Sequence, residues 1–103
     1  MTGPPDVAVV ETAAVPVGGG VVVAALNVVV TQPVEGEFAA FDATCTHRGC
    51  TVRSVAAGTI SCFCHGSRFR IADGSVAGGP APSPLPRREI IVTGGTVRLV
   101  SGP

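Results

Sequence analysis

The chain has 103 residues, a length that forms one domain, and its seven acidic residues balance seven arginines, so the formal net charge at pH 7 is zero. The absence of a basic excess argues against a nucleic-acid partner. The composition is 46% hydrophobic but only 4% aromatic, with no Trp or Tyr. Much of the apolar content is valine, a β-branched residue that favours strands over helices.

Short apolar runs separated by turn residues follow one another along the chain, a pattern typical of an all-β sandwich or barrel. The pairs Asp73-Gly74 and Gly94-Gly95 are strong hairpin signals. No segment shows the period of a helix, and no internal repeat is present. In chain order, strands are expected at residues 7–12, 21–25, 28–32, 37–41, 51–55, 59–62, 68–71, 75–76, 89–93 and 96–100.

Residues 1–6 have neither the basic region nor the apolar run of a signal peptide. The longest apolar stretch, residues 21–30, is interrupted by Asn27 and is too short to span a bilayer. We therefore expect no membrane span in the chain as given. These observations are compatible with a leader or anchor that has been removed.

All four cysteines and both histidines lie in two short segments. The first, residues 45–50, reads C-x-H-x-G-C, and the second, residues 62–67, reads C-x-C-H-G-S after a gap of eleven residues. Residues placed for packing alone would be scattered along the chain. The two segments therefore look like the halves of one metal site.

This bipartite pattern resembles the Rieske [2Fe–2S] iron–sulfur family, in particular its disulfide-containing members such as small actinobacterial Rieske domains. The resemblance implies one cluster per chain, in which two thiolates hold one iron and two imidazoles hold the other. It also implies an all-β fold of the Rieske type, an antiparallel β-sandwich or barrel with a cluster-binding part at about residues 43–86. The implied ligands are Cys45, His47, Cys62 and His65.

The resemblance implies roles for four further residues near the ligands. Cys50 and Cys64 match the disulfide that ties the two cluster loops together in the family. Ser67 matches the serine whose hydroxyl donates to a bridging sulfide, so it should raise the reduction potential. Phe69 stands where high-potential members have a tyrosine that donates to a ligand thiolate, and a phenylalanine cannot make this hydrogen bond.

A Gly- and Pro-rich stretch, residues 78–86, follows the second segment by about a dozen residues. Such stretches are often surface linkers. In the Rieske family, however, a proline loop at this place covers the cluster. The residues that match this loop are Gly79, Pro80, Ala81 and Pro82.

Two other interpretations of the cysteines and histidines remain open at this point. Two Cys and two His also suit a zinc-stabilised β module that binds proteins, although structural zinc sites usually use C-x₂₋₄-C and H-x₃₋₅-H pairs. A Rieske-type ferredoxin that supplies an oxygenase is the second alternative. Ferredoxins of this kind normally lack the extra cysteine pair.

The resemblance implies a one-electron transfer protein that works with a redox partner whose identity the sequence does not give. No nucleophile–base pair and no pair of acid/base carboxylates is evident, so we expect an electron carrier, or the Rieske subunit of an oxidoreductase, rather than a catalyst by itself. Disulfides persist mainly in oxidising compartments, so an extracytoplasmic location is favoured over a cytoplasmic one.

Overall fold

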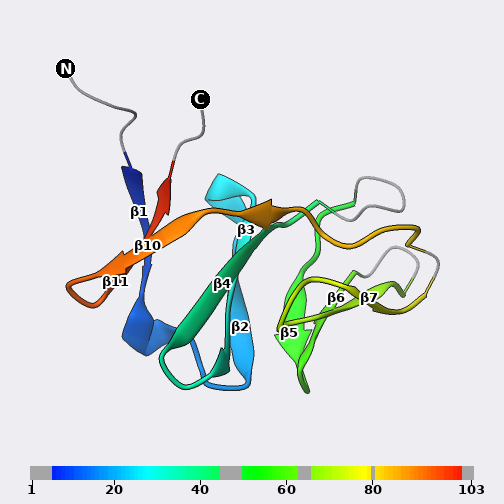
Figure 1. Ribbon diagram of the computed structural model, residues 1–103. Coiled ribbons are helices and arrows are strands. Elements are labelled where there is room, and N and C mark those ends of the chain that lie inside the picture. Colours follow the sequence, from blue (N-terminus) through cyan, green and yellow to red (C-terminus); the bar gives the residue numbers. More distant parts are fainter. Residues whose placement is uncertain (1–5, 45–49, 63–65, 80, 101–103) are drawn as a thin grey trace.

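The computed structural model describes residues 6–44, 50–62, 66–79 and 81–100. Within these ranges the chain forms eleven short strands in three antiparallel sheets, together with two 3₁₀ turns (Figure 1). The prediction of an all-β fold is confirmed. No helix in these ranges is long and apolar enough to cross a membrane.

The first sheet joins the two ends of the chain, and its strand order is β1-β11-β10. Its strands are β1 (Asp6–Glu11), β10 (Ile90–Thr93) and β11 (Thr96–Val100). The second sheet has the order β2-β3-β4-β9 and consists of β2 (Gly19–Val23), β3 (Val28–Val34), β4 (Glu37–Asp42) and β9 (Arg87–Arg88).

The third sheet is a meander in which consecutive strands pair, in the order β5-β6-β7-β8. Its strands are β5 (Ser54–Ala56), β6 (Thr59–Ser61), β7 (Arg68–Arg70) and β8 (Val76–Gly78). Figure 1 shows β5, β6 and β7 at one end of the molecule and β1, β10 and β11 at the other, with β2, β3 and β4 between them.

The second sheet has a hydrophobic core on each face, because successive residues of a strand point to opposite sides. Val28 and Val30 of β3 pack with Val97 of β11 in one core. Val29 belongs to the other core, which contains Phe69 of β7. Burial on both faces explains why residues 28–30 are all apolar rather than alternating with polar residues.

Most predicted strands are present with bounds shifted by one to three residues, but three short elements were missed. The expected strand 21–25 ends at Val23, and the chain continues into a 3₁₀ turn, η2 (Ala24–Leu26). A second such turn, η1 (Thr12–Ala14), follows β1. Strand β9 has only two residues, both arginine, so it carries no apolar pattern from which a strand could be predicted.

Candidate metal centre

Part of the predicted site lies in the described ranges. Cys50, Cys62, Ser67, Phe69, Gly79, Ala81 and Pro82 are described, whereas Cys45, His47, Cys64, His65 and Pro80 lie outside the described residues. Among the described residues no cluster of three metal-ligating side chains occurs, and three of the four predicted ligands are not among them. What the structure shows of the site is the backbone that enters and leaves each of the two ligand segments.

The segment with Cys45 and His47 begins and ends at a narrow neck. Thr44 and Thr51 form an antiparallel bridge across it. One residue further out, the Val52 amide donates to the Ala43 carbonyl at 2.7 Å. Strand β4 enters this neck, and the chain that leaves it runs on to β5, so both ends of the ligand segment are fixed to sheet structure.

The segment with Cys62 and His65 has a neck of its own. The Cys62 amide donates to the Ser67 carbonyl at 2.9 Å, and the Gly66 amide donates to the Cys62 carbonyl at 3.2 Å. Strand β6 ends at Ser61 and β7 begins at Arg68, and these two residues are register partners. The tight return is possible because Gly66 has a positive φ of 76°, which a residue with a Cβ rarely adopts.

The two necks are neighbours because a single hairpin connects them. Ser54, at the start of β5, is the register partner of Ser61, at the end of β6. The Arg53 amide donates to the Ser61 carbonyl at 3.2 Å, which continues this pairing toward both necks. The β5–β6 hairpin, with Ala57 and Gly58 in its turn, thus returns the chain from the first ligand segment to the second.

The described side chains of the second neck fit a buried sulfur-rich group. Cys62 is 2% exposed and belongs to the core that contains Phe69. Ser67 is fully buried, and its Oγ has no hydrogen-bond partner among the described residues. A buried hydroxyl without a partner costs about 1–3 kcal/mol, so such groups are rare unless a ligand or ion accepts the bond. This orphaned donor beside a predicted ligand is what a cluster sulfide would satisfy.

The Gly- and Pro-rich stretch runs against the second neck rather than away from it. A Cβ at Gly79 would lie 2.5 Å from the Ser67 Cα, so only glycine allows this approach. Ala81 is buried in the same core as Cys62. The far end of the stretch is held by a hydrogen bond from the Asp42 amide to the Pro86 carbonyl at 2.8 Å. Ala81 and Leu85 are thus anchored in the core, whereas Pro82, Ser83 and Pro84 are exposed.

Of the other two described site residues, Phe69 is a core residue and Cys50 lies nearer the surface. Phe69 is fully buried, and on β7 it is the register partner of Ile60 and Val76. Cys50 is half-buried and disulfide-bonded, and its predicted partner Cys64 lies outside the described residues. The orientation of the Phe69 ring toward a ligand thiolate stays a prediction, because Cys45 lies outside the described ranges as well.

A polar cluster at the entrance to the first neck was missed by the sequence analysis. The Asn27 Nδ2 donates to Asp42 Oδ1 at 2.9 Å and to Thr44 Oγ1 at 3.0 Å. The Thr44 amide donates to the same Asp42 oxygen at 2.8 Å, and the Ala43 amide donates to the Asn27 carbonyl at 3.0 Å. Asn27 has a left-handed backbone (φ 55°), and asparagine in an apolar run was the available signal, which we interpreted only as a strand break.

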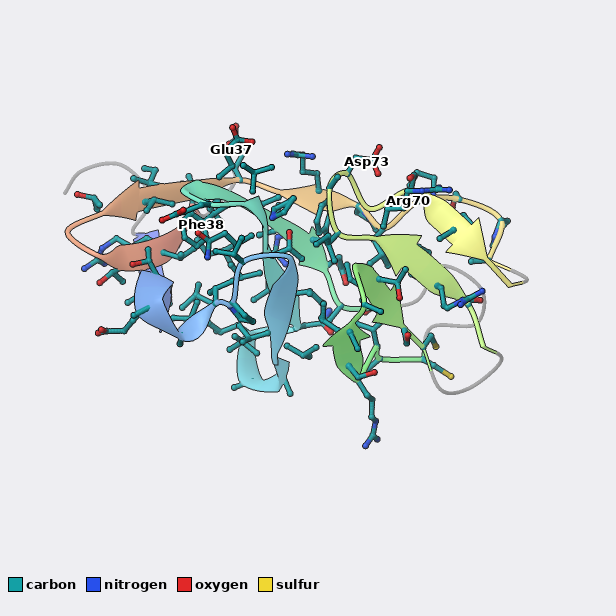
Figure 2. The ribbon with its side chains drawn as sticks, turned by 90° about the horizontal axis from the view of Figure 1, so that it is seen from below. Glu37, Phe38, Arg70 and Asp73 are labelled. Atoms are coloured by element: carbon teal, nitrogen blue, oxygen red, sulfur yellow. The ribbon has the colours of Figure 1, made fainter. Side chains whose placement is uncertain are left out.

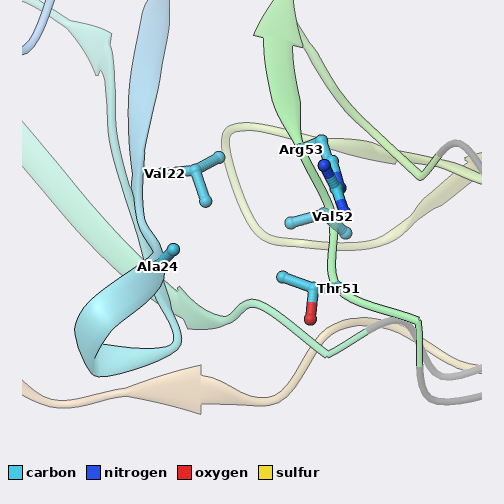
Figure 3. Close-up of a pocket in the computed structure, with 5 residues that line it drawn as sticks. All are labelled: Val22, Ala24, Thr51, Val52 and Arg53. Atoms are coloured by element: carbon cyan, nitrogen blue, oxygen red, sulfur yellow. The ribbon is translucent and has the colours of Figure 1, made fainter.

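An open pocket of about 440 Å³ lies where the second and third sheets meet (Figure 3). Its lining comes from β2, from the start of η2 and from the chain that leaves the first neck, and it consists of Val22, Ala24, Thr51, Val52 and Arg53. Among the described residues that line it there is no carboxylate, histidine or cysteine.

Comparisons with known proteins agree with this geometry. The family model of the Rieske [2Fe–2S] domain matches residues 6–89. A protein of Haloferax mediterranei, provisionally named a respiratory nitrate reductase subunit Rieske, is 34% identical over 77 residues, which are 74% of this chain and 35% of that protein. The cytochrome b6-f complex iron-sulfur subunit of a Synechococcus species is 43% identical over 59 residues, which are 56% of this chain and 34% of that subunit.

The chain thus spans about a third of the length of these two curated relatives. Among solved structures, the cyanobacterial plasma membrane Rieske protein PetC3 from Synechocystis superposes with a TM-score of 0.72 at 29% identity, over 92% of this chain and 99% of that one. With the family model matched over most of its length, this chain belongs to the Rieske [2Fe–2S] domain family.

Proposed function

We propose that Cys45 and Cys62 hold one iron of the cluster, that His47 and His65 hold the other, and that the chain passes single electrons to and from a protein partner. As a Rieske domain the chain carries one [2Fe–2S] cluster, which accepts and releases one electron. Rieske proteins work with redox partners, and the identity of this chain's partner is open. The observation that carries the ligand proposal is the buried Ser67 Oγ, which has no hydrogen-bond partner among the described residues; the carbonyl of Ser67 accepts from the Cys62 amide.

The chain's own residues hold and shield the site. The two necks fix where each ligand segment starts and ends, and the β5–β6 hairpin sets the necks side by side. We assign the cover to Gly79, Pro80, Ala81 and Pro82. The close contact of Gly79 with Ser67 and the burial of Ala81 support this assignment. We further propose that residues 1–103 form a single Rieske domain whose cluster-binding part is about residues 43–86.

A disulfide between Cys50 and Cys64 would close the two ligand segments against each other. The disulfide-bonded state of Cys50 supports this pairing. Because such bonds persist mainly in oxidising compartments, we propose that the domain works outside the cytoplasm. The proposed activity is electron transfer within a larger redox system rather than catalysis by this domain alone.

The ligand assignment is tested by Cys62→Ala, with Ser61→Ala at the preceding residue as the matched control. We expect Cys62→Ala to lose iron and acid-labile sulfide together with the reduced EPR signal, because alanine cannot ligate iron and three protein ligands leave the cluster labile. Ser61→Ala should keep all three. Full iron and sulfide content in Cys62→Ala would contradict the assignment. A zinc site would instead give a colourless, EPR-silent wild-type protein.

A further inference from the structure

Acidic and basic residues are unevenly distributed along this chain, whose net charge is zero. The proposed cluster-binding part, residues 43–86, carries one acidic residue and four arginines: Asp73, Arg48, Arg53, Arg68 and Arg70. The rest of the chain carries three arginines and six acidic residues: Arg87, Arg88, Arg98, Asp6, Glu11, Glu35, Glu37, Asp42 and Glu89. The two parts therefore have net charges of opposite sign, which the overall value of zero conceals.

Three of these arginines lie on the third sheet or next to it, and all three are exposed. Arg53 directly precedes β5, and its backbone pairs with Ser61 beside the second neck. Arg68 is the first residue after that neck, and its guanidinium lies against Gly78, where an added Cβ would be 3.1 Å from Nη2. Arg70 Nη1 donates to the Val76 carbonyl at 3.0 Å. We call Arg53, Arg68 and Arg70 the basic end; Arg68 and Arg70 lie on the outward face of β7, and Arg53 borders the pocket beside β2.

The acidic residue in this region does not cancel the basic end. Hydrogen bonds from Ser75 hold the pKa of the exposed Asp73 carboxyl below its usual range, so this group is charged at neutral pH. Three exposed arginines against one aspartate leave a local excess of positive charge. Formally, a reduced Rieske cluster adds only one negative charge to a neutral oxidised one, so the excess remains positive in both redox states.

Glu11 on β1 and Glu37 at the start of β4 lie on the other two sheets, whereas Asp42 stands at the first neck and adds one negative charge beside the cluster-binding part. The molecule measures 42 × 29 × 19 Å, whereas the Debye length is about 8 Å at physiological ionic strength. Figure 2 shows Arg70 and Asp73 together, well away from Glu37 on the β3–β4 hairpin. A partner that approaches the cluster therefore experiences the local positive charge rather than the neutral whole.

We infer that the basic end is the docking surface for an acidic face of the redox partner protein. The inference rests on the proposed function, since electrons must pass through the part of the chain that holds the ligands. Complementary charge raises the rate of productive encounter more than it raises affinity, which suits a brief electron-transfer contact. An anionic membrane is the other acidic surface available. Binding there would cover the end that a partner must reach, so a protein is the favoured occupant.

Small redox probes of opposite charge test the local sign without the partner. The reduced wild-type protein is oxidised by anionic ferricyanide or by cationic tris(phenanthroline)cobalt(III) while the ionic strength rises from about 0.1 M to about 1 M, which shortens the Debye length from about 10 Å to about 3 Å. The ferricyanide rate constant should fall by roughly threefold or more, and the cobalt rate constant should rise. Poly-glutamate should slow ferricyanide oxidation at low salt, and poly-lysine should not.

The double variant Arg53→Gln/Arg68→Gln should lose most of this salt dependence. Arg98→Gln removes the same kind of charge from β11, at the opposite end, and should keep it. A flat or reversed salt dependence in the wild type, or an equal effect of Arg98→Gln, would overturn the inference. Tight binding to phosphatidylserine vesicles that blocks oxidation would overturn it in favour of a membrane. Voltammetry of the domain alone, without a redox partner, separates the two proposals. If the domain shows no reversible one-electron couple, the proposed function is refuted. If it shows a reversible couple but its oxidation rate constants do not depend on ionic strength, only the docking surface is refuted.

Discussion

Ser67 is the single residue whose environment says most about the site. Its side chain is fully buried, and its hydroxyl has no partner within the described ranges. Serine at such a place destabilises a protein unless something accepts its hydrogen bond. The backbone of the same residue closes the second neck through its carbonyl. Ser67 therefore closes the second neck with its backbone and holds a buried hydroxyl that no described residue satisfies.

We expect Ser67→Ala to change a different property of the cluster-free and of the cluster-loaded protein. Without the cluster, the free energy of unfolding should stay the same or rise, because a buried unpaired hydroxyl is removed. With the cluster, the midpoint potential should fall by tens of millivolts, since a donated hydrogen bond is stronger to the more negative reduced state; about 59 mV corresponds to a tenfold change for one electron. Denaturation and voltammetry measure the two effects.

Ser67→Thr serves as the control, because it keeps the hydroxyl and should keep most of the potential if the extra methyl is accommodated. An unchanged potential in Ser67→Ala with an intact cluster would show that the hydroxyl does not donate to it.

Phe69→Tyr tests the other predicted tuning position. Phe69 is fully buried in the core that contains Cys62, so an added hydroxyl cannot reach water without displacing that core. If the ring points at the Cys45 sulfur, the midpoint potential should rise by tens of millivolts. If it does not, the unpaired hydroxyl should lower the free energy of unfolding by about 1–3 kcal/mol with no shift in potential. Voltammetry and denaturation of the same sample distinguish the two.

At the scale of elements, hydrogen bonds of Asn27 connect the end of the turn η2 to the end of β4. Its amide bridges Asp42 and Thr44, and Thr44 is the last described residue before the first ligand segment. Asn27→Ala removes these bonds and places an alanine in the left-handed region, so we expect a loss of about 2 kcal/mol in unfolding free energy. If Cys45 is a ligand, the cluster EPR spectrum should broaden, since the neck at Thr44 loses this support.

Asn27→Gly is the matched variant, because glycine tolerates the left-handed backbone but also lacks the amide. It should show the spectral change with a smaller loss of stability. A wild-type spectrum in both variants would mean that the polar cluster stabilises the fold without positioning the ligand segment.

The elements show why prediction from sequence succeeded in some places and failed in others. Strand positions followed from turn residues, as at Gly94 and Gly95 between β10 and β11. The pairing of strands far apart in the chain did not, because nothing local indicates that β1 pairs with β11, or that β4 pairs with β9 as well as with β3. Asn27 was missed for the same reason. Its partners lie 15 and 17 residues away, and nothing local marks them.

At the scale of the whole molecule, the spacing of cysteines and histidines predicted the family, which the comparisons confirmed. The ligand assignment stays a prediction, because only Cys62 of the four lies in the described ranges. The tight contact between Gly79 and Ser67 could not be read from composition, since a Gly-Pro stretch has the same appearance in a linker and in a cover. The contact of Gly79 with Ser67 and the burial of Ala81 favour a cover, which stays a prediction.

The β5–β6 hairpin has a consequence for how the ligand motif is measured. Fourteen residues separate His47 from Cys62 in the sequence, yet most of them run out to the turn at Ala57 and Gly58 and back. The number of residues between His47 and Cys62 therefore depends on the length of the β5–β6 hairpin and not on the distance between the two ligand segments. Adding or removing one cross-strand pair near the tip changes the count by two and leaves Ser54 opposite Ser61. Motif searches with a fixed gap would miss proteins whose sites are geometrically the same.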